Sequence, residues 1–271
     1  MEEIKFIDSG INSGKFNMAA DYYFSREKLE SPIFRVYRWK PYCISLGYHQ
    51  KIDEIDLERL KNYNIDLVRR ETGGRAVFHA TELTYSMIIP KNSQFYSDSI
   101  MDVYNKISKV LVRGLNLTGV SSADLERGEA PNFKNLYKEK LSSVCFSSTS
   151  TYEVVSRGKK IVGSAQKRLK DSVLQHGSIL VGLDHIDLID YLSIPERLKS
   201  RFKEQVKEKT TTVAQLIDLE KNQYENFYKE LSENLYISLE EIFGVKVNRY
   251  YFNNSEISEI TKNEKYFKLD Y

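Results

Sequence analysis

The sequence from residue 69 to residue 79 reads Arg-Arg-Glu-Thr-Gly-Gly-Arg-Ala-Val-Phe-His, and it places a glycine turn between two predicted strands. Glycine permits positive φ and lets a ligand approach the backbone closely. The flanking arginines can donate hydrogen bonds to an anion or a carbonyl group. The segment lacks the Gly-x-x-x-x-Gly-Lys-Ser/Thr pattern of a P-loop. From composition alone, a tight hairpin with solvated arginines is as good an interpretation as a ligand site.

Outward from this turn, apolar alternation predicts strands and helical spacing predicts helices. The predicted strands cover residues 3–8, 32–39, 43–46, 65–68, 76–79, 83–89, 152–155, 160–162, 174–183 and 245–251. The predicted helices cover residues 16–29, 56–63, 102–117, 186–192, 211–219, 223–243 and 254–265. Residues 119–144 are polar and weakly periodic, which predicts a long loop with room for one short strand. Because strands come first and helices gather at the end, we expect an α+β fold with a mainly antiparallel sheet.

The composition is that of a soluble globular protein, with 271 residues, 41% hydrophobic and 29% charged. Forty basic and 38 acidic side chains leave a net charge of +2, which argues against nucleic acid as the main partner. The N-terminus has no secretory signal pattern and no apolar run is long enough to span a membrane. We therefore expect a cytoplasmic protein, organised as one domain over residues 1–271, with neither nucleic acid nor membrane as partner.

Two further segments carry side chains that could do chemistry. Lys160 opens an apolar strand that ends in small residues, Gly163 and Ser164, against which a substrate could lie. A surface lysine on an edge strand is about twice as probable for Lys160 when nothing else is known. His176, followed by Gly177, is by itself more simply an ordinary hydrogen-bonded histidine.

The two cysteines differ in their surroundings. They are too few for a disulfide framework or a structural zinc site, so free thiols are expected. Cys43 lies between Tyr42 and Ile44 in a predicted strand, which is typical of a structural cysteine. Cys145 lies among serines at the end of the long polar segment, which makes it the better candidate for a reactive thiol.

Taken in order, these segments resemble the biotin/lipoate ligase and octanoyltransferase superfamily. The segments that carry the resemblance are 6–10, 16–19, 35–39, 44–50, 69–79, 82–86, 160–166 and 175–180. The octanoyltransferase branch fits best, because the segment Ser142-Ser143-Val144-Cys145-Phe146 resembles its catalytic-cysteine segment. The turn reads Gly73-Gly74-Arg75, where ATP-dependent lipoate ligases usually have a third glycine.

The resemblance implies a fold, an activity and partners. The fold would be the biotin/lipoate ligase catalytic domain, a mixed, largely antiparallel sheet flanked by helices, with a helical extension from about residue 190 to residue 271. The activity would be transfer of an octanoyl group from acyl carrier protein to a lysine of the glycine-cleavage H protein or another lipoyl-domain protein. A thioester is already activated, so neither ATP nor a metal would be needed, and the enzyme would be a monomer.

The resemblance also assigns residues. Cys145 would carry the octanoyl group as nucleophile, with Lys160 as its catalytic partner. Substrate-binding residues would be Arg70, Gly73, Gly74, Arg75, Val77, His79, Val162, Gly163, Ser164, His176 and Gly177. Among these, Val77 and Val162 would line the acyl tunnel, His79 and His176 would shape its walls, and Gly73-Gly74 or Gly163-Ser164 would stabilise the oxyanion. Part of a basic surface for the acidic carrier protein would be Lys167, Arg168 and Lys170.

The sequence departs from the family pattern at two places, Ala80 where an aspartate is usual and Thr151 where an aromatic residue is common. Three alternatives stay open. They are an ATP-dependent lipoate–protein ligase, which would not need Cys145, an amidotransferase that moves octanoyl or lipoyl groups between carrier proteins, and a binding module for lipoyl or biotinoyl domains that has lost catalysis.

Overall fold

The computed structural model describes residues 2–125 and 153–269, which form eleven strands and seven α-helices within those ranges. The strands are β1 (Ile4–Asn12), β2 (Ile33–Trp39), β3 (Cys43–Leu46), β4 (Asp66–Arg69), β5 (Val77–His79), β6 (Glu82–Pro90), β7 (Ala123–Leu125), β8 (Val154–Ser156), β9 (Lys159–Arg168), β10 (Ser172–Leu180) and β11 (Val247–Arg249). The helices are α1 (Gly14–Arg26), α2 (Leu57–Asn62), α3 (Ile100–Leu117), α5 (Glu196–Lys209), α6 (Val213–Ile217), α7 (Tyr224–Phe243) and α8 (Asn254–Asn263). Leu183–Tyr191 forms a 3-10 helix, η4.

The strands form two sheets. Eight of them run in the order β11-β1-β2-β6-β10-β9-β8-β7, and three form a smaller sheet in the order β4-β3-β5. In the large sheet only the β11–β1 and β1–β2 pairs are parallel, with Ile4 opposite Val247 at the start of the first pair. The other five neighbouring pairs are antiparallel. The expected α+β fold with a largely antiparallel sheet is therefore confirmed.

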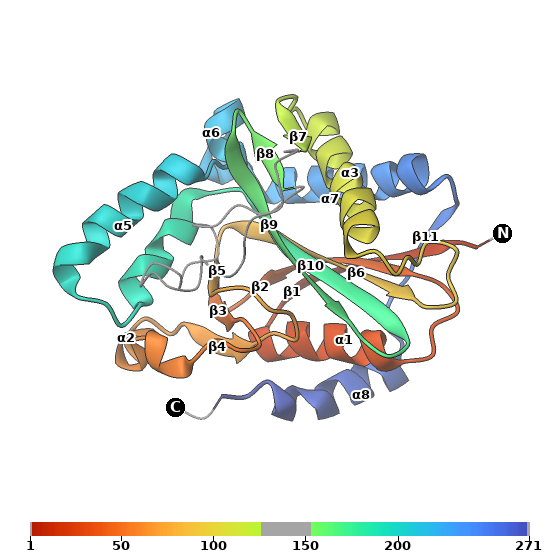
Figure 1. The fold of residues 1–271 in the computed structure, drawn as a ribbon, viewed down its shortest axis with the longest axis horizontal. Helices are drawn as coiled ribbons and strands as arrows, with labels where there is room; N and C mark the ends of the chain where they lie inside the picture. Colours follow the sequence, from red (N-terminus) through yellow and green to blue (C-terminus); the bar gives the residue numbers. More distant parts are fainter. Residues whose placement is uncertain (1, 126–152, 270–271) are drawn as a thin grey trace.

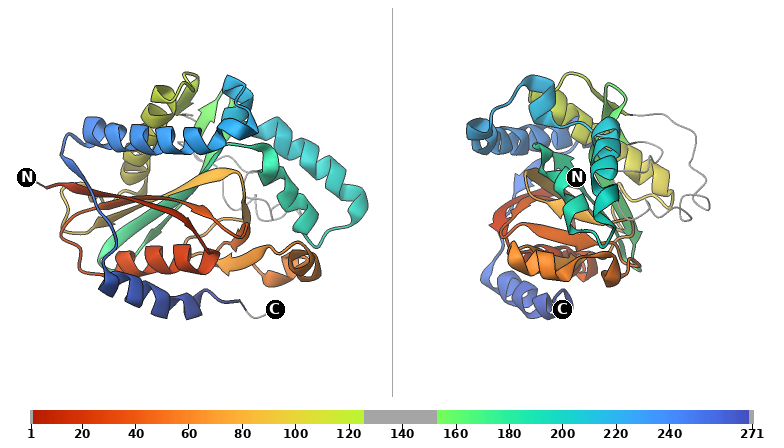
Figure 2. Two further views of the ribbon diagram at one scale, coloured as in Figure 1. Left: turned by 180° about the vertical axis from the view of Figure 1, so that it is seen from behind. Right: turned by 90° about the vertical axis from the view of Figure 1, so that its left-hand side faces the viewer.

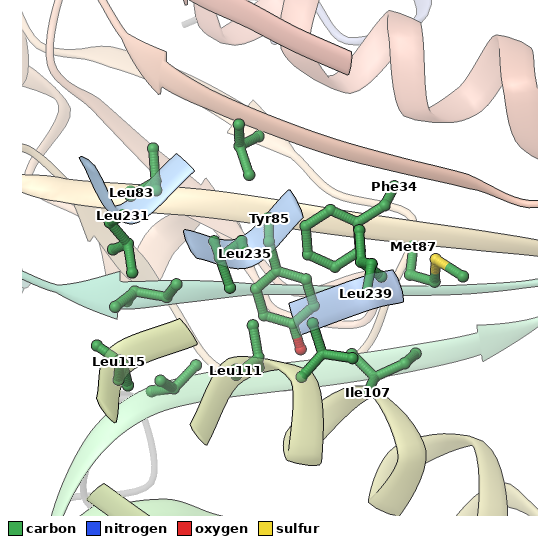
Figure 3. Close-up of a cluster of buried hydrophobic side chains, with 14 of the residues drawn as sticks. Phe34, Leu83, Tyr85, Met87, Ile107, Leu111, Leu115, Leu231, Leu235 and Leu239 are labelled. Carbon is green, nitrogen blue, oxygen red and sulfur yellow. The ribbon is translucent and has the colours of Figure 1, made fainter. Parts of the chain in front are cut away.

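Helices cover both faces of the large sheet (Figures 1 and 2). α1 lies on one face with α8 packed outside it, and α3 and α7 lie on the other. Strand alternation explains the layers, because successive side chains point to opposite faces. Phe34 on β2 and Tyr85 on β6 point toward α3 and α7, where they meet Leu111 and Leu235 (Figure 3). A Cβ on Gly114 of α3 would lie 2.7 Å from Leu235, so glycine permits this close helix contact.

One helix of the structure was not predicted from the sequence, and one predicted helix is of a different type. α5 was not expected as a helix, because its residues are mostly charged and only Leu198, Phe202 and Val206 mark an apolar stripe. The predicted helix at 186–192 is a 3-10 helix instead. α7 packs its apolar stripe into the same core as the sheet. Within the described ranges, no helix is both long and apolar enough to cross a bilayer.

Candidate functional site

A mainly apolar pocket lies between the two sheets, on the face of the large sheet that α1 covers. It is lined by side chains and backbone of β2, β6, β9 and β10 from the large sheet, β3 and β5 from the small one, and α1. The lining residues are Met18, Tyr37, Trp39, Ser45, Arg70, Val77, His79, Thr84, Gly163, Ser164, Ala165, His176, Gly177 and Ser178. Residues that are more than 150 positions apart in sequence therefore meet in one concave site, which is where ligands usually bind.

The structure brings together seven of the residues that the sequence predicts for substrate binding. They are Arg70, Val77, His79, Gly163, Ser164, His176 and Gly177. Gly177 also has a packing role, because a Cβ there would lie 2.5 Å from the carbonyl oxygen of Gly163 on the neighbouring strand. The segments on β5, β9 and β10 thus meet at one pocket.

Five of the predicted site residues that the structure describes lie outside this lining, namely Gly73, Gly74, Arg75, Lys160 and Val162. Val162 is buried in the core cluster that α3 and α7 share with the sheet, so it does not line the pocket. Lys160 stands three residues before Gly163 on β9, about 10 Å along the strand at the usual rise. It is buried, and its Nζ lies 2.6 Å from Oε1 of Glu153.

The glycine turn is held by Arg70 from inside. Of the two glycines only Gly74 takes a positive φ, +90°, and both are exposed on the surface, with Arg75 half-buried beside them. The guanidinium of Arg70 donates to the carbonyl oxygens of Gly73 (2.8 Å) and Arg75 (2.7 Å) and to the carbonyl oxygen of Ser45 (2.8 Å). These bonds fix the shape of the turn, a role that the sequence reading did not assign to Arg70.

Gly47 makes the close approach that seats this turn. A Cβ on Gly47 would lie 1.9 Å from the carbonyl oxygen of Gly74, so no side chain fits without moving the turn. We expect Gly47→Ala to lower the free energy of unfolding by about 1–3 kcal/mol. Chemical denaturation measures this effect. Gly73→Ala is the matched control, because a Cβ there meets nothing within 4 Å and should be tolerated; equal stability of the two variants would contradict the packing argument.

A buried relay of polar groups supports one wall of the pocket. Oδ2 of Asp21 on α1 lies 3.2 Å from Nδ1 of His176, and Nε2 of His176 lies 2.6 Å from Oγ1 of Thr72. Arg35 donates to the other carboxylate oxygen of Asp21 at 2.9 Å. Burial alone would raise the pKa of Asp21, but Arg35 and then His176 lower it to about 2. Asp21 therefore stays ionised and holds His176 in one orientation.

A second relay supports the facing wall. Nδ1 of His79 lies 3.1 Å from Oε1 of Glu82, and its Nε2 lies 2.8 Å from Oγ of Ser45. Burial lowers the pKa of His79, although Glu82 opposes this, so the ring is neutral. Its Nδ1–H then donates to Glu82, and the hydroxyl of Ser45 donates to Nε2. Trp39 stacks on the ring with centroids 3.9 Å apart.

Sequence reasoning missed the acidic members of the site. Asp21, Glu82 and Glu153 are buried, and each contacts a residue that the sequence did single out. One signal was available in the sequence for Glu82, which directly precedes the apolar strand predicted at 83–89. In the structure all nine residues of this strand, β6, are buried. An acidic side chain in such a strand needs a buried partner.

The structure describes only one of the two cysteines, since Cys145 lies outside the described residues. Cys43 is fully buried, and burial raises the pKa of its thiol well above the ordinary value, which fits its predicted packing role.

Two residues of the expected basic surface have partners within the chain. Lys167 pairs with Glu71 at 2.8 Å, and Arg168 donates to the Ser97 carbonyl oxygen at 2.8 Å. Those two charges are thus already engaged within the chain.

Known proteins are similar in sequence to most of this chain. The family model for the lipoyl protein ligase A/B catalytic domain matches residues 13–235. Octanoyltransferase LipM of Bacillus subtilis (strain 168) is 40% identical over 223 residues, which cover 80% of each chain. Octanoyltransferase LipM of Anoxybacillus flavithermus is 36% identical over 269 residues, which cover 96% of this chain and 94% of that relative.

Solved structures share the fold at lower sequence identity. A bi-partite lipoate protein ligase from Thermoplasma acidophilum superposes with a TM-score of 0.75 at 22% identity, covering 98% of this chain and 93% of that one. A lipoate-protein ligase A bound with ATP gives a TM-score of 0.72 at 22% identity, covering 98% and 95%. The predicted ligase-type fold is therefore confirmed.

Proposed function

Because the chain belongs to the lipoyl protein ligase A/B catalytic domain family, we propose that it transfers octanoyl groups in protein lipoylation through a thioester on Cys145. The observation that carries the activity is its similarity to octanoyltransferases, 34–43% identical, across most of its length. The chain is an acyltransferase on this basis. The cysteine intermediate, the identity of the donor and the acceptor, and the absence of ATP and metal from the reaction are the parts that need experiment.

The proposed reaction has two steps. The thiolate of Cys145 attacks the thioester carbonyl of octanoyl-acyl carrier protein, forming a new C–S bond, and the carrier thiolate leaves and takes a proton. The amine of the acceptor lysine, on the H protein or another lipoyl-domain protein, then attacks the enzyme thioester. An amide forms, and the thiol of Cys145 is released. Covalent catalysis of this kind divides one difficult transfer into two easier ones.

The pocket between the sheets supports this proposal. Met18, Trp39 and Val77 offer apolar surface for an eight-carbon chain, and the backbone at Gly163 and Gly177 lines the same pocket. Lys160 would act as a charged ammonium group that stabilises the thiolate and the acyl oxyanion. Backbone N–H groups around Gly163 and Ser164, on the same strand as Lys160, are candidate oxyanion donors.

The thioester is tested by mass spectrometry. The protein is mixed with octanoyl-acyl carrier protein in the absence of ATP, and an octanoyl adduct is sought on the peptide that contains Cys145. We expect an adduct that hydroxylamine removes. Transfer that proceeds only with ATP and free fatty acid, with no adduct, would instead support a ligase. Octanoyl-H protein offered as donor separates an amidotransferase from the proposed enzyme.

Lys160→Ala should lower the transfer rate by about 10²–10⁴-fold, because one preorganised charge is removed from the developing oxyanion. Single-turnover transfer from octanoyl-acyl carrier protein measures the effect. Lys159→Ala is the matched control, since Lys159 is the exposed neighbour on the same strand. Near-normal transfer by Lys160→Ala would remove this residue from the mechanism.

A further inference from the structure

We propose that Glu153 is a positioning residue for acyl transfer, which fixes the ammonium group of Lys160. The inference rests on the proposed role of Lys160 and adds a residue to it. Nζ of Lys160 lies 2.6 Å from Oε1 of Glu153, and their side chains are only 6% and 3% exposed. At this distance a charge-assisted hydrogen bond sets direction as well as energy.

The hairpin between β8 and β9 places the pair. Arg157 and Gly158 at its tip both take positive φ, 50° and 73°, as a tight two-residue hairpin turn requires. Val155 lies opposite Lys160, and the register shifts between Val154 and Val155. Glu153 therefore reaches Lys160 diagonally across a bulged point of the ladder. Bulges of this kind often re-aim a side chain beside an active site.

The backbone of Lys160 is fixed separately, from the segment that follows α5. The backbone N–H of Thr211 donates to the carbonyl oxygen of Lys160 at 2.9 Å, and Thr210 forms a parallel bridge with Lys160. Nε2 of His185 in turn lies 2.9 Å from Oγ1 of Thr210. Because the backbone of Lys160 is held on two sides, only its side chain can still change rotamer, and the Glu153 carboxylate restricts that change.

This arrangement matters because transfer depends on where the cation is held. A flexible lysine would spend much of its time away from the reacting carbonyl, whereas a second group that locks its rotamer keeps it in the productive position. A purely structural ion pair would affect folding and leave the rate of the folded enzyme unchanged. A positioning pair lowers kcat while leaving the apparent KM for the donor nearly unchanged.

The test compares Glu153→Gln and Glu153→Asp with the unaltered full-length enzyme. Each is assayed for kcat and KM with octanoyl-acyl carrier protein as donor, and thermal denaturation establishes that each is folded. Asp190→Asn is the matched control, because it removes the carboxylate of another ion pair, with Lys203, that is half-buried and does not include Lys160. Lys160→Ala is assayed in parallel as the reference for complete loss of the ammonium group.

The expected result is a fall in kcat of at least tenfold for Glu153→Gln and a smaller fall for Glu153→Asp, which keeps the charge on a shorter side chain. KM should stay within about twofold, and Asp190→Asn should behave as the unaltered enzyme. The proposal is overturned if folded Glu153→Gln keeps kcat within twofold, or, should that variant not fold, if Glu153→Asp does. If Lys160→Ala itself is active, the role proposed for Lys160 fails, which is a separate result.

Discussion

Cys145→Ala should lower octanoyl transfer by at least about 10³-fold, because it removes the nucleophile on which both half-reactions depend. The thiolate is the attacking species, and alanine leaves only uncatalysed aminolysis of the bound thioester. Cys145→Ser should also be severely impaired, since a hydroxyl is far less ionised near neutral pH and would form a less reactive oxyester. Single-turnover transfer to a lipoyl-domain acceptor measures both variants.

Cys43→Ala is the matched control for the cysteine proposal. Cys43 packs against α1 in the core, and a Cβ on Gly14 would lie 2.6 Å from its sulfur. Losing this buried thiol should reduce stability slightly while leaving transfer per folded molecule unchanged. Full transfer by Cys145→Ser would refute the acyl-enzyme and would favour an ATP-dependent ligase instead.

Asp21→Asn should destabilise the fold by about 3–5 kcal/mol, because it leaves the guanidinium of Arg35 buried without its counter-charge. Arg35 is 1% exposed and lies 2.9 Å from Asp21, which also accepts hydrogen bonds from Tyr37 (2.9 Å) and Ser86 (2.8 Å). The same change removes the support of His176, so donor binding should weaken as well. Chemical denaturation at neutral pH measures the loss of stability.

The pH dependence gives this prediction a second readout. The pKa of Asp21 lies at about 2 in the folded protein, below the ordinary 3.8. A depressed pKa means that the carboxylate stabilises the fold above pH 4 and that this contribution, about 2 kcal/mol, disappears as the pH falls toward 2. Asp21→Asn should lack that part of the acid-induced loss. Asp98→Asn, at an exposed aspartate, is the control, and identical acid profiles for Asp21→Asn and the unaltered protein would contradict the assignment.

How far the sequence predicts the site depends on whether a residue acts within its own segment. The turn at 69–79 and the small residues of β9 were found because their spacing is local. The contact of Asp21 with His176 joins residues 155 positions apart, and that of Glu82 with Ser178 joins residues 96 apart. Which strands become neighbours is a property of the whole sheet, so a pattern along one segment cannot reveal such partners.

Other differences from the prediction are local. Val162 was expected beside the tunnel, but it pairs with Ile179 and packs with it in the core cluster. Glu153 could have been found, because the strands predicted at 152–155 and 160–162 are close enough in sequence to pair and so bring it toward Lys160. α5 was not predicted because its composition is mostly charged and a stripe of three apolar residues is a weak periodic signal.

The parallel pairing of β1 with β11 has a consequence for how the protein is made. On a ribosome that adds about 5–20 residues per second, β1 emerges first and its outer partner, beginning at Val247, follows about 10–50 s later. During that interval the nascent chain carries a strand whose outer hydrogen-bonding groups are unpaired, a common starting point for aggregation. The outer edge of β1 should therefore stay open to chaperones until β11 has been released from the ribosome and has paired with it.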